Sequence, residues 1–444
     1  MKKYLKANII NPSEYTFVQI DFGDGVFRKY TTQSLWYGIL LDDDQELKNV
    51  KIKAPSSVLT DVSVIESLEP EREIETEFDE NCHIEGDFEV PPEVTTISAD
   101  AFAGCDNLKS VTVPDSVEVV QEEAFKDCEK LESVKVSDSV LTNGDDKFQN
   151  KELPLTITVD GEGDTLSTSN SFKSNSFNVN ISPKSTEISS SRFKNATKIK
   201  SVTIPGSVTS IENFAFSGCT SLTSVTIPDS VTSIGGYAFR DCTSLNSIMI
   251  PDSVTYIGDR AFSDCSNLVS INIPSNVAYI GNYAFCGCKS LASSITIPDS
   301  VTSIGNYTFF NCESLTSITI PSSVTIMGDY AFHGCTRLTS ITIPDGVKSI
   351  RYAAFQNCTS LENITIPNNV TSIGNCAFLG CTSLSSVTIP NNVISIGTSA
   401  FNNCTNLKTL KYKGTEAQWE TISKGSNWNN NCPAEVVFNY EGNE

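Results

Sequence analysis

The sequence is poor in histidine, in basic residues and in long apolar runs. Its 444 residues contain two histidines, His83 and His333, and no metalloprotease pair, phosphate-binding loop or nucleophile-elbow motif occurs. We therefore predict no catalytic residue, no metal ligand and no cofactor, and we expect His333 to be an ordinary surface residue. Lys and Arg total 31 against 53 Asp and Glu, giving a net charge of −22. This balance argues against nucleic acid as a partner, because phosphate binding needs clustered cations. No apolar run approaches the ~18 residues that cross a bilayer, so we expect no insertion into a membrane.

The negative charge is concentrated near the start of the chain. Between Asp61 and Val94, Arg72 is the only Lys or Arg among many acids. Such a run is usually a solvated face or a linker, with a cation or partner site as the alternative.

Prolines after a Val/Ile-x-Ile pattern recur at a nearly constant interval. They stand at Pro205, Pro228, Pro251, Pro274, Pro298, Pro321, Pro344, Pro367 and Pro390. The interval is 23 residues except for one of 24, where Ala292-Ser293-Ser294 carries an extra residue. Counting backwards extends the array over residues 91–412, with degenerate turns at 137–181 in which Phe148, Ile157 and Val159 stay in phase. A fixed period of this length indicates a solenoid.

Apolar residues occupy the same places in each repeat when positions are counted from the proline as zero. In the turn from Pro228 they are Val231, Ile234, Ala238, Phe239, Cys242, Leu245, Ile248 and Ile250. The last two alternate with polar neighbours, which predicts a strand before the next proline. A glycine at +7 marks a bend, and the Ala-Phe pair predicts a short helical or 3₁₀ return segment. One turn buries too little to fold alone, so the turns must stack.

The pattern Leu-x-x-Val-x-Ile-Pro-x-x-Val-x-x-Ile-Gly-x-x-Ala-Phe-x-x-Cys resembles the BspA-type leucine-rich repeat (leucine-rich repeat type 5). Leu222, Val225, Ile227 and Val231 stand at its apolar positions. The resemblance implies a mainly β leucine-rich-repeat solenoid with a parallel β-sheet on its concave face. It also implies a surface or secreted protein that acts as an adhesin or a protein-binding scaffold.

The segments outside the regular repeats suggest four regions. Residues 1–65 predict a small β unit or N-terminal cap, with a hairpin over 15–30 and further strands near 35–41 and 50–52. Residues 66–90 read as an acidic, degenerate first turn, 91–412 as the solenoid and 413–444 as a C-terminal cap. In the cap, Thr415 and Gln418 have the spacing of a capping box. Trp419 and Trp428 are expected to cover the last turn, with a ligand platform as the alternative.

Most of the 15 cysteines fall in phase with the repeat. Those at +14 are Cys105, Cys128, Cys219, Cys242, Cys265, Cys288, Cys312, Cys335, Cys358, Cys381 and Cys404, and Cys82 fits the partial turn. We expect reduced thiols packed as small hydrophobes, with occasional disulfides or metal binding as alternatives. A thiol-rich core and a basic start (Met1-Lys2-Lys3) without the apolar stretch of a signal peptide favour an intracellular location. The family resemblance favours the cell surface.

Two surface ladders are candidate binding sites. The first, at +9, comprises Phe214, Tyr237, Arg260, Tyr283, Tyr307 and Tyr330 and is called the aromatic stripe below. The second lies on the outward side of the predicted concave sheet and includes Ser224, Thr226, Ser317, Thr319, Ser340 and Thr342. The alternative is that the stripe residues pack over the corner and only shield the core. The repeated hydroxyls suit an extended or multivalent protein or glycan rather than one small ligand.

These features favour a non-enzymatic, adhesin-like binding scaffold. Two alternatives are an enzyme or sensor in residues 1–65 with the repeat as its targeting arm, and a structural or self-associating repeat protein.

Overall fold

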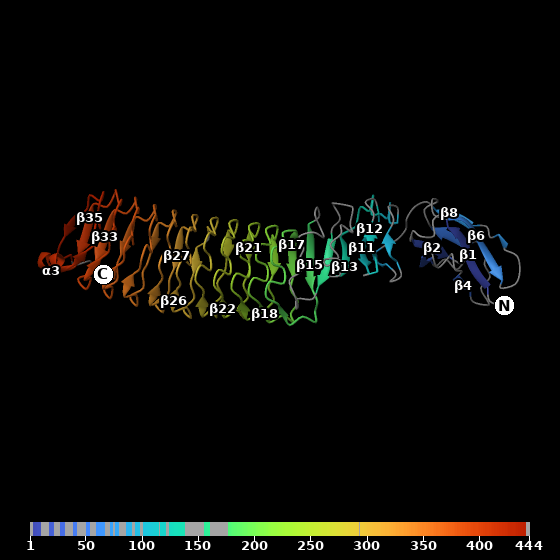
Figure 1. Cartoon of the computed structure of the whole chain (residues 1–444), viewed down its shortest axis with the longest axis horizontal. Helices are drawn as coiled ribbons and strands as arrows, with labels where there is room; N and C mark the ends of the chain where they lie inside the picture. Colours follow the sequence, from blue (N-terminus) through green and yellow to red (C-terminus); the bar gives the residue numbers. More distant parts are fainter. Residues whose placement is uncertain are drawn as a thin grey trace. The chain divides into compact units, whose positions relative to one another are not determined.

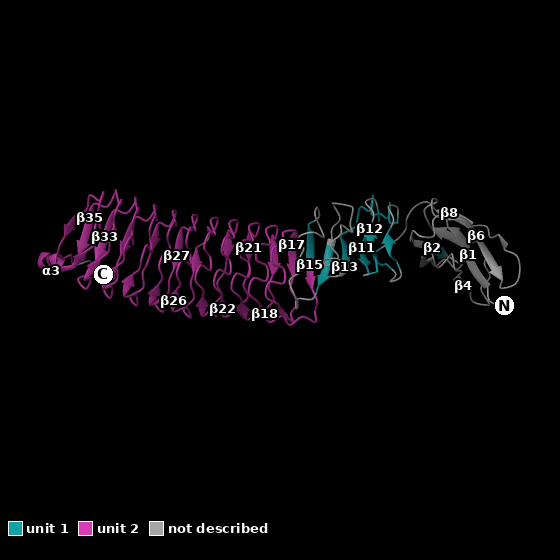
Figure 2. Ribbon diagram, viewed as in Figure 1, with its two compact units in different colours: residues 1–159, 170–178 teal, residues 160–169, 179–444 magenta. Residues whose placement is uncertain are grey.

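The computed structural model describes strands within residues 3–79 and then residues 86–90, 94–97, 101–114, 116–120, 124–137, 155–159, 176–292 and 294–440. Two compact units are distinguished (Figure 2). Unit 1 comprises residues 1–159 and 170–178, and unit 2 comprises residues 160–169 and 179–444. Strand β15 (Phe177–Ile181) contains residues of both units.

The first part of unit 1 contains two four-stranded sheets. One has the order β4-β1-β6-β7 and the other β3-β2-β5-β8. Their strands are β1 (Lys3–Ile9), β2 (Phe17–Asp21), β3 (Phe27–Thr31), β4 (Ile39–Leu41), β5 (Val50–Lys53), β6 (Leu59–Glu66), β7 (Arg72–Glu73) and β8 (Thr76–Asp79). The predicted hairpin is present, because β2 and β3 pair antiparallel from Phe17↔Thr31 to Asp21↔Phe27.

The second part of unit 1 contains turns of a parallel β-solenoid. Its strands are β9 (Gly86–Glu89), β10 (Thr96–Ile97), β11 (Leu108–Val113), β12 (Val119–Val120), β13 (Ser133–Ser137) and β14 (Leu155–Val159). Strand β11 pairs parallel with β9 and β13, β13 with β14, and β10 with β12. Ile157 and Val159 of β14 are buried, as their phase in the degenerate turns predicts.

Unit 2 is a parallel β-solenoid with two strands in each turn (Figure 1). The first-sheet strands, of which β17 to β33 precede the prolines, are β17 (Ile199–Thr203), β19 (Ser224–Thr226), β21 (Ser247–Ile248), β23 (Ser270–Ile271), β25 (Ile295–Thr296), β27 (Ser317–Thr319), β29 (Ser340–Ile341), β31 (Asn363–Thr365), β33 (Ser386–Ile389), β35 (Thr409–Tyr412) and β37 (Glu435–Val437). The second-sheet strands, at +5 and +6, are β16 (Glu187–Ile188), β18 (Ser210–Ile211), β20 (Ser233–Ile234), β22 (Tyr256–Ile257), β24 (Tyr279–Ile280), β26 (Ser303–Ile304), β28 (Ile326–Met327), β30 (Ser349–Ile350), β32 (Ser372–Ile373), β34 (Ser395–Ile396) and β36 (Ser423–Lys424).

Equivalent residues of successive turns lie side by side in unit 2. Val202 pairs with Val225, and Ile211 pairs with Ile234. The phenylalanines at +11 form a continuous buried stack, in which Phe216 and Phe239 have ring centroids 5.3 Å apart and nearly parallel planes. The prediction of a leucine-rich-repeat solenoid with parallel β-structure is thus confirmed.

The return segment of each turn differs from the predicted short helix. It consists of hydrogen-bonded turns in which alternate amides point in different directions. The Ala238 amide donates within its own turn to Gly235, whereas the Phe239 amide donates to Ala261 of the next turn. A helix cannot continue here because the residues at +9 and +13, such as Tyr237 and Asp241, have a φ of 59°.

The glycine at +7 is required by the close approach of neighbouring turns. A Cβ placed on Gly258 would lie 2.5 Å from the backbone nitrogen of Gly236. The second-sheet strand that precedes this glycine was not predicted, because two residues per turn are too few to show a period of two.

The C-terminal end of unit 2 is covered by a short helix, α3 (Glu416–Thr421). Thr415 accepts a hydrogen bond from the Gln418 amide, and the Gln418 side chain accepts one from the Thr415 amide, so the predicted capping box is present. Trp419 and Ile422 are buried, and the Trp419 ring contacts Tyr412 at 5.1 Å and Trp428 at 5.9 Å. Within the described residues, none of the helices has the length and apolar character that a bilayer crossing needs.

Candidate functional site

The outward side of the first sheet presents a ladder of hydroxyl groups. Ser201 pairs with Ser224 and Thr203 with Thr226, so equivalent hydroxyls follow one another along the stack. Ser224, Thr226, Thr319, Ser340 and Thr342 are exposed, and Ser317 is half-buried. The structure thus places the predicted second ladder on an accessible surface, which we call the first-sheet face.

The aromatic stripe is also assembled as a ladder. Its rings stack face to face, with centroids 4.4 Å apart for Phe214 and Tyr237 and 4.4 Å apart for Tyr283 and Tyr307. Tyr307 and Tyr330 follow at 4.5 Å.

Arg260 continues the aromatic stripe between two tyrosines. Its guanidinium lies 3.9 Å from the ring centroid of Tyr283 and 5.7 Å from that of Tyr237. Lys194 extends the column at its other end, with Nζ 4.9 Å from the Phe214 centroid. The stripe is therefore a column of stacked rings with one cation at its end and one inserted within it, held by cation–π contacts as well as by stacking.

Every residue of the aromatic stripe has a left-handed backbone. The φ angles are 60° at Phe214, 59° at Tyr237, 58° at Tyr283, 56° at Arg260 and Tyr307, and 55° at Tyr330. Bulky side chains are rare in this region because the Cβ crowds the following carbonyl, at a cost of roughly 1–2 kcal/mol per residue. The same position holds Ala353, Cys376 and Ser399 in later turns, also with positive φ. Sequence reasoning could not find this strain, since glycine or asparagine normally marks it.

Stacking limits what the aromatic stripe can offer a ligand. Because neighbouring rings cover each other's faces, the half-buried tyrosines expose mainly ring edges and hydroxyl groups. Burial raises the pKa of Tyr307, so its hydroxyl remains a neutral donor and acceptor at physiological pH.

A second aromatic pair, which the sequence analysis did not single out, lies on the second sheet. Tyr256 and Tyr279 stack with centroids 5.0 Å apart, and they are 42% and 40% exposed. The Tyr279 hydroxyl donates to Oδ1 of Asp259 at 3.4 Å. The sequence did contain a signal for this pair, because tyrosine stands at +5 in two adjacent turns.

The cysteines at +14 form a buried column with a defined bond for each thiol. Cys242 Sγ donates to the carbonyl of Phe216 in the preceding turn at 3.2 Å, and Cys265 repeats this contact to Phe239 at 3.0 Å. Burial raises the pKa of the Cys219 thiol to about 12, so the column is protonated and unreactive. The predicted reduced core thiols are present from Cys219 to Cys404.

Cys105 departs from that prediction, because it is disulfide-bonded although it stands at +14 and is fully buried. Cys82 and His83 lie outside the described residues. Among the residues that are described, no group of three or more His, Cys, Asp or Glu side chains could hold a metal ion.

His333 is more enclosed than the surface position predicted for it. It is half-buried and its ring stacks on Phe310 at 4.6 Å, next to Tyr330 of the aromatic stripe. Burial lowers the pKa of His333, so the imidazole is neutral near pH 7. The prediction that His333 is exposed was therefore wrong, because its side chain is half-buried.

A model of the BspA type leucine rich repeat region matches residues 72–196, 186–316 and 302–430, in 6 copies. The chain belongs to the BspA-type leucine-rich repeat family. The matches cover most of the sequence and include the degenerate turns.

Several solved structures are similar to this BspA-type repeat protein. A leucine rich cell surface protein from Faecalibacterium prausnitzii is 29% identical, with 77% of this chain and 91% of that chain covered and a TM-score of 0.42. A T. pallidum leucine-rich repeat protein is 27% identical over 47% of this chain and 83% of that chain, with a TM-score of 0.34. A leucine-rich repeat protein from Bacteroides ovatus is 24% identical over 79% and 91%, with a TM-score of 0.31. Among curated proteins, none matches. Since these TM-scores are low, family membership rests on the repeat model.

Proposed function

We propose that this BspA-type repeat protein is a non-enzymatic scaffold that recognises an extended partner through its repeat surface, with the aromatic stripe as the principal contact. The observation that carries the proposal is the retention of bulky residues at a left-handed backbone position over six successive turns. A position with this backbone would be less strained with glycine or asparagine. Strained positions of this kind gather at functional sites.

The chemistry of the aromatic stripe favours a protein over a glycan as its partner. A sugar binds an aromatic side chain through the face of the ring, and most ring faces here are occupied by the neighbouring tyrosine. Tyrosine edges and hydroxyls, together with Arg260, are instead typical of the centres of protein interfaces. The first-sheet face supplies exposed hydroxyls that could add weaker, repeated contacts, so that affinity accumulates along the array.

The test compares the purified chain with a variant in which Tyr237, Tyr283, Tyr307 and Tyr330 are replaced together by serine. Both are applied to arrays of extracellular-matrix proteins and of glycans, and circular dichroism establishes that the variant is folded. We expect the parent to bind a protein on the array and the variant to lose at least about tenfold in affinity, since interface tyrosines commonly contribute more than 1 kcal/mol each.

A matched control replaces Ser224, Ser317 and Ser340 of the first-sheet face by alanine. This change should weaken binding only slightly, because exposed hydroxyl contacts contribute little individually. Equal binding by a folded tyrosine variant would remove the aromatic stripe from the proposal. Sedimentation over a concentration series distinguishes the alternative of self-association, which would appear as a concentration-dependent increase in mass.

A further inference from the structure

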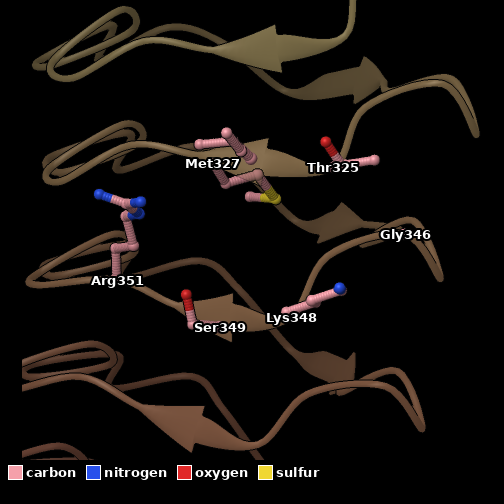
Figure 3. Close-up of a pocket in the computed structure, with 7 residues that line it drawn as sticks. Thr325, Met327, Gly346, Lys348, Ser349 and Arg351 are labelled. Carbon is pink, nitrogen blue, oxygen red and sulfur yellow. The ribbon is translucent and has the colours of Figure 1, made fainter.

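The repeat departs from its own pattern at five positions around one boundary, between the turns that start at Pro321 and Pro344. At these positions the other turns mostly have serine at +5, isoleucine at +6, serine or asparagine at +2, threonine at +4 and glycine at +7. The departures are Ile326, Met327, Gly346, Lys348 and Arg351. All five line one cavity of about 360 Å³, together with Thr325 and Ser349 (Figure 3). In an otherwise uniform array, this is the place where unlike residues converge.

The cavity coincides with an opening between two neighbouring turns. Within the described strands, β28 and β30 do not pair, and the first sheet is interrupted at the same boundary between β29 and β31. One turn later the Thr371 amide donates to the Lys348 carbonyl at 3.0 Å, and the Gly374 amide donates to Ile350 at 2.7 Å. The amides of Lys348 and Arg351 donate no corresponding bond in the part of the chain that the structure describes.

Two of the substituted residues lie at this opening, although the described strands β24 and β26 also do not pair with each other, at a boundary that keeps the usual glycine at +7, Gly305. Neighbouring turns approach so closely at +7 that a Cβ on Gly374 would lie 2.8 Å from the backbone of the preceding turn. Arg351 places a side chain at this point of close approach, as Glu212 does in an earlier turn, where the Glu212 amide still donates to Ile188 of the preceding turn at 2.9 Å. Gly346 also removes a link, since the serine at its position in the preceding turn, Ser323, donates to the Val301 carbonyl at 2.7 Å.

The cavity has a cationic lining in a strongly acidic protein. Figure 3 shows Arg351 and Lys348 on either side of Ser349. Both are exposed, and neither forms a salt bridge with any described residue. Two cations beside a cavity favour an anion, and the guanidinium fork matches a carboxylate. Ile326, which is 47% exposed, provides an apolar wall, and Thr325 and Ser349 provide hydroxyls.

We infer that this cavity binds a carboxylate-bearing monosaccharide, either free or at the end of an acidic glycan. The carboxylate contacts Arg351, Lys348 adds positive charge from the other side of Ser349, the sugar hydroxyls bond to Thr325 and Ser349, and the C–H face of the ring packs against Ile326. The volume lies within the range of small-ligand pockets. This site is separate from the aromatic stripe and does not depend on the function proposed for it.

The test is a calorimetric or NMR titration of the full chain with glucuronic acid, with glucose as the neutral control. We expect glucuronic acid to bind and glucose to bind at least about tenfold more weakly, with an affinity for the acid that falls as salt rises. A disaccharide ending in glucuronic acid distinguishes the two sources of the sugar. Tighter binding of the disaccharide indicates a glycan end, and equal binding indicates the free monosaccharide.

The variants Arg351→Gly and Lys348→Thr restore the usual repeat residues, so both should fold. Arg351→Gly is expected to weaken glucuronic acid binding at least about tenfold and Lys348→Thr to weaken it by a smaller factor, whereas Arg337→Thr, which removes an exposed cation of the preceding turn outside the cavity, should not. Gly346→Ser should also reduce binding, by closing the opening.

Equal binding of glucose, equal binding by the two restored variants, or glutamate binding as tightly as glucuronic acid would overturn the inference. The tyrosine variant of the aromatic stripe should still bind glucuronic acid. The two proposals can therefore be refuted independently of each other.

Discussion

Replacing the left-handed residue at +9 by glycine should have opposite effects in two turns of the same array. Tyr307 and Ser399 occupy equivalent positions, with φ angles of 56° and 55°. Tyr307 stacks between Tyr283 and Tyr330, whereas Ser399 is half-buried and lies outside the aromatic stripe. We predict that Tyr307→Gly destabilises its turn and that Ser399→Gly stabilises it.

The magnitudes follow from the contacts. Glycine relieves roughly 1–2 kcal/mol of left-handed strain but costs about 0.5–1 kcal/mol in chain entropy, so Ser399→Gly should stabilise by about 0.5–1 kcal/mol. Tyr307→Gly gains the same amount. It loses two stacking contacts of about 1 kcal/mol each and roughly 100 Å² of buried surface, which is about 2.5 kcal/mol. The expected net effect is a destabilisation of about 3.5–4 kcal/mol.

Hydrogen exchange at the affected turns is a suitable assay, because repeat arrays need not unfold in one step. The amide of Phe309, which donates to Ala331 of the next turn, reports on the Tyr307 variant. The Phe401 amide, which donates to Trp428, reports on the Ser399 variant. Stabilisation by Tyr307→Gly would refute the idea that stacking offsets the strain, and destabilisation by Ser399→Gly would refute the backbone argument itself.

Three further predictions concern the framework. Burial raises the pKa of Cys219 to about 12, so the folded state keeps a proton that the unfolded state loses above about pH 9. The free energy of unfolding should be unaffected below that pH. Between pH 9 and 12 it should fall by about 1.4 kcal/mol per pH unit for each such thiol. An equal urea midpoint at pH 8 and pH 10 would contradict this. Gly258→Ala should lower the urea midpoint by the equivalent of at least about 2 kcal/mol because of the backbone contact at 2.5 Å, whereas exposed Gly206→Ala should have little effect. Thr415→Ala should destabilise α3 by about 1 kcal/mol, measured as faster exchange of the Trp419 amide, and Thr415→Ser should restore protection.

The sequence predicted the parts of the fold that depend on period and polarity. Apolar residues repeated every turn identify the core, and Phe239 and Cys242 are buried where their phase requires. The alternation before each proline predicted the first sheet, and the Thr415–Gln418 spacing predicted the capping box. Each of these signals involves a pattern of several residues or a specific local bond.

The remaining features depend on contacts between turns, which a single turn does not encode. The second sheet has two residues per turn and owes its pairing to the turns above and below. The packing of successive turns gives Tyr307 a positive φ, a backbone conformation that tyrosine normally avoids. The cavity at Arg351 was missed for the opposite reason, because it arises where five separate departures from the repeat meet in space. No one of these departures identifies a site.

The thiol column also sets how the array responds to damage. Each Sγ donates to the preceding turn, as Cys288 does to Phe262 at 3.1 Å, so oxidation of one thiol adds polar oxygen atoms inside the stack and removes the tie to its neighbour. The oxidant must first reach the sulfur, and the intact column excludes it. Oxidative inactivation should therefore begin at an end of the column, where Cys404 is the last thiol, and advance turn by turn, because each damaged turn exposes the thiol of its neighbour.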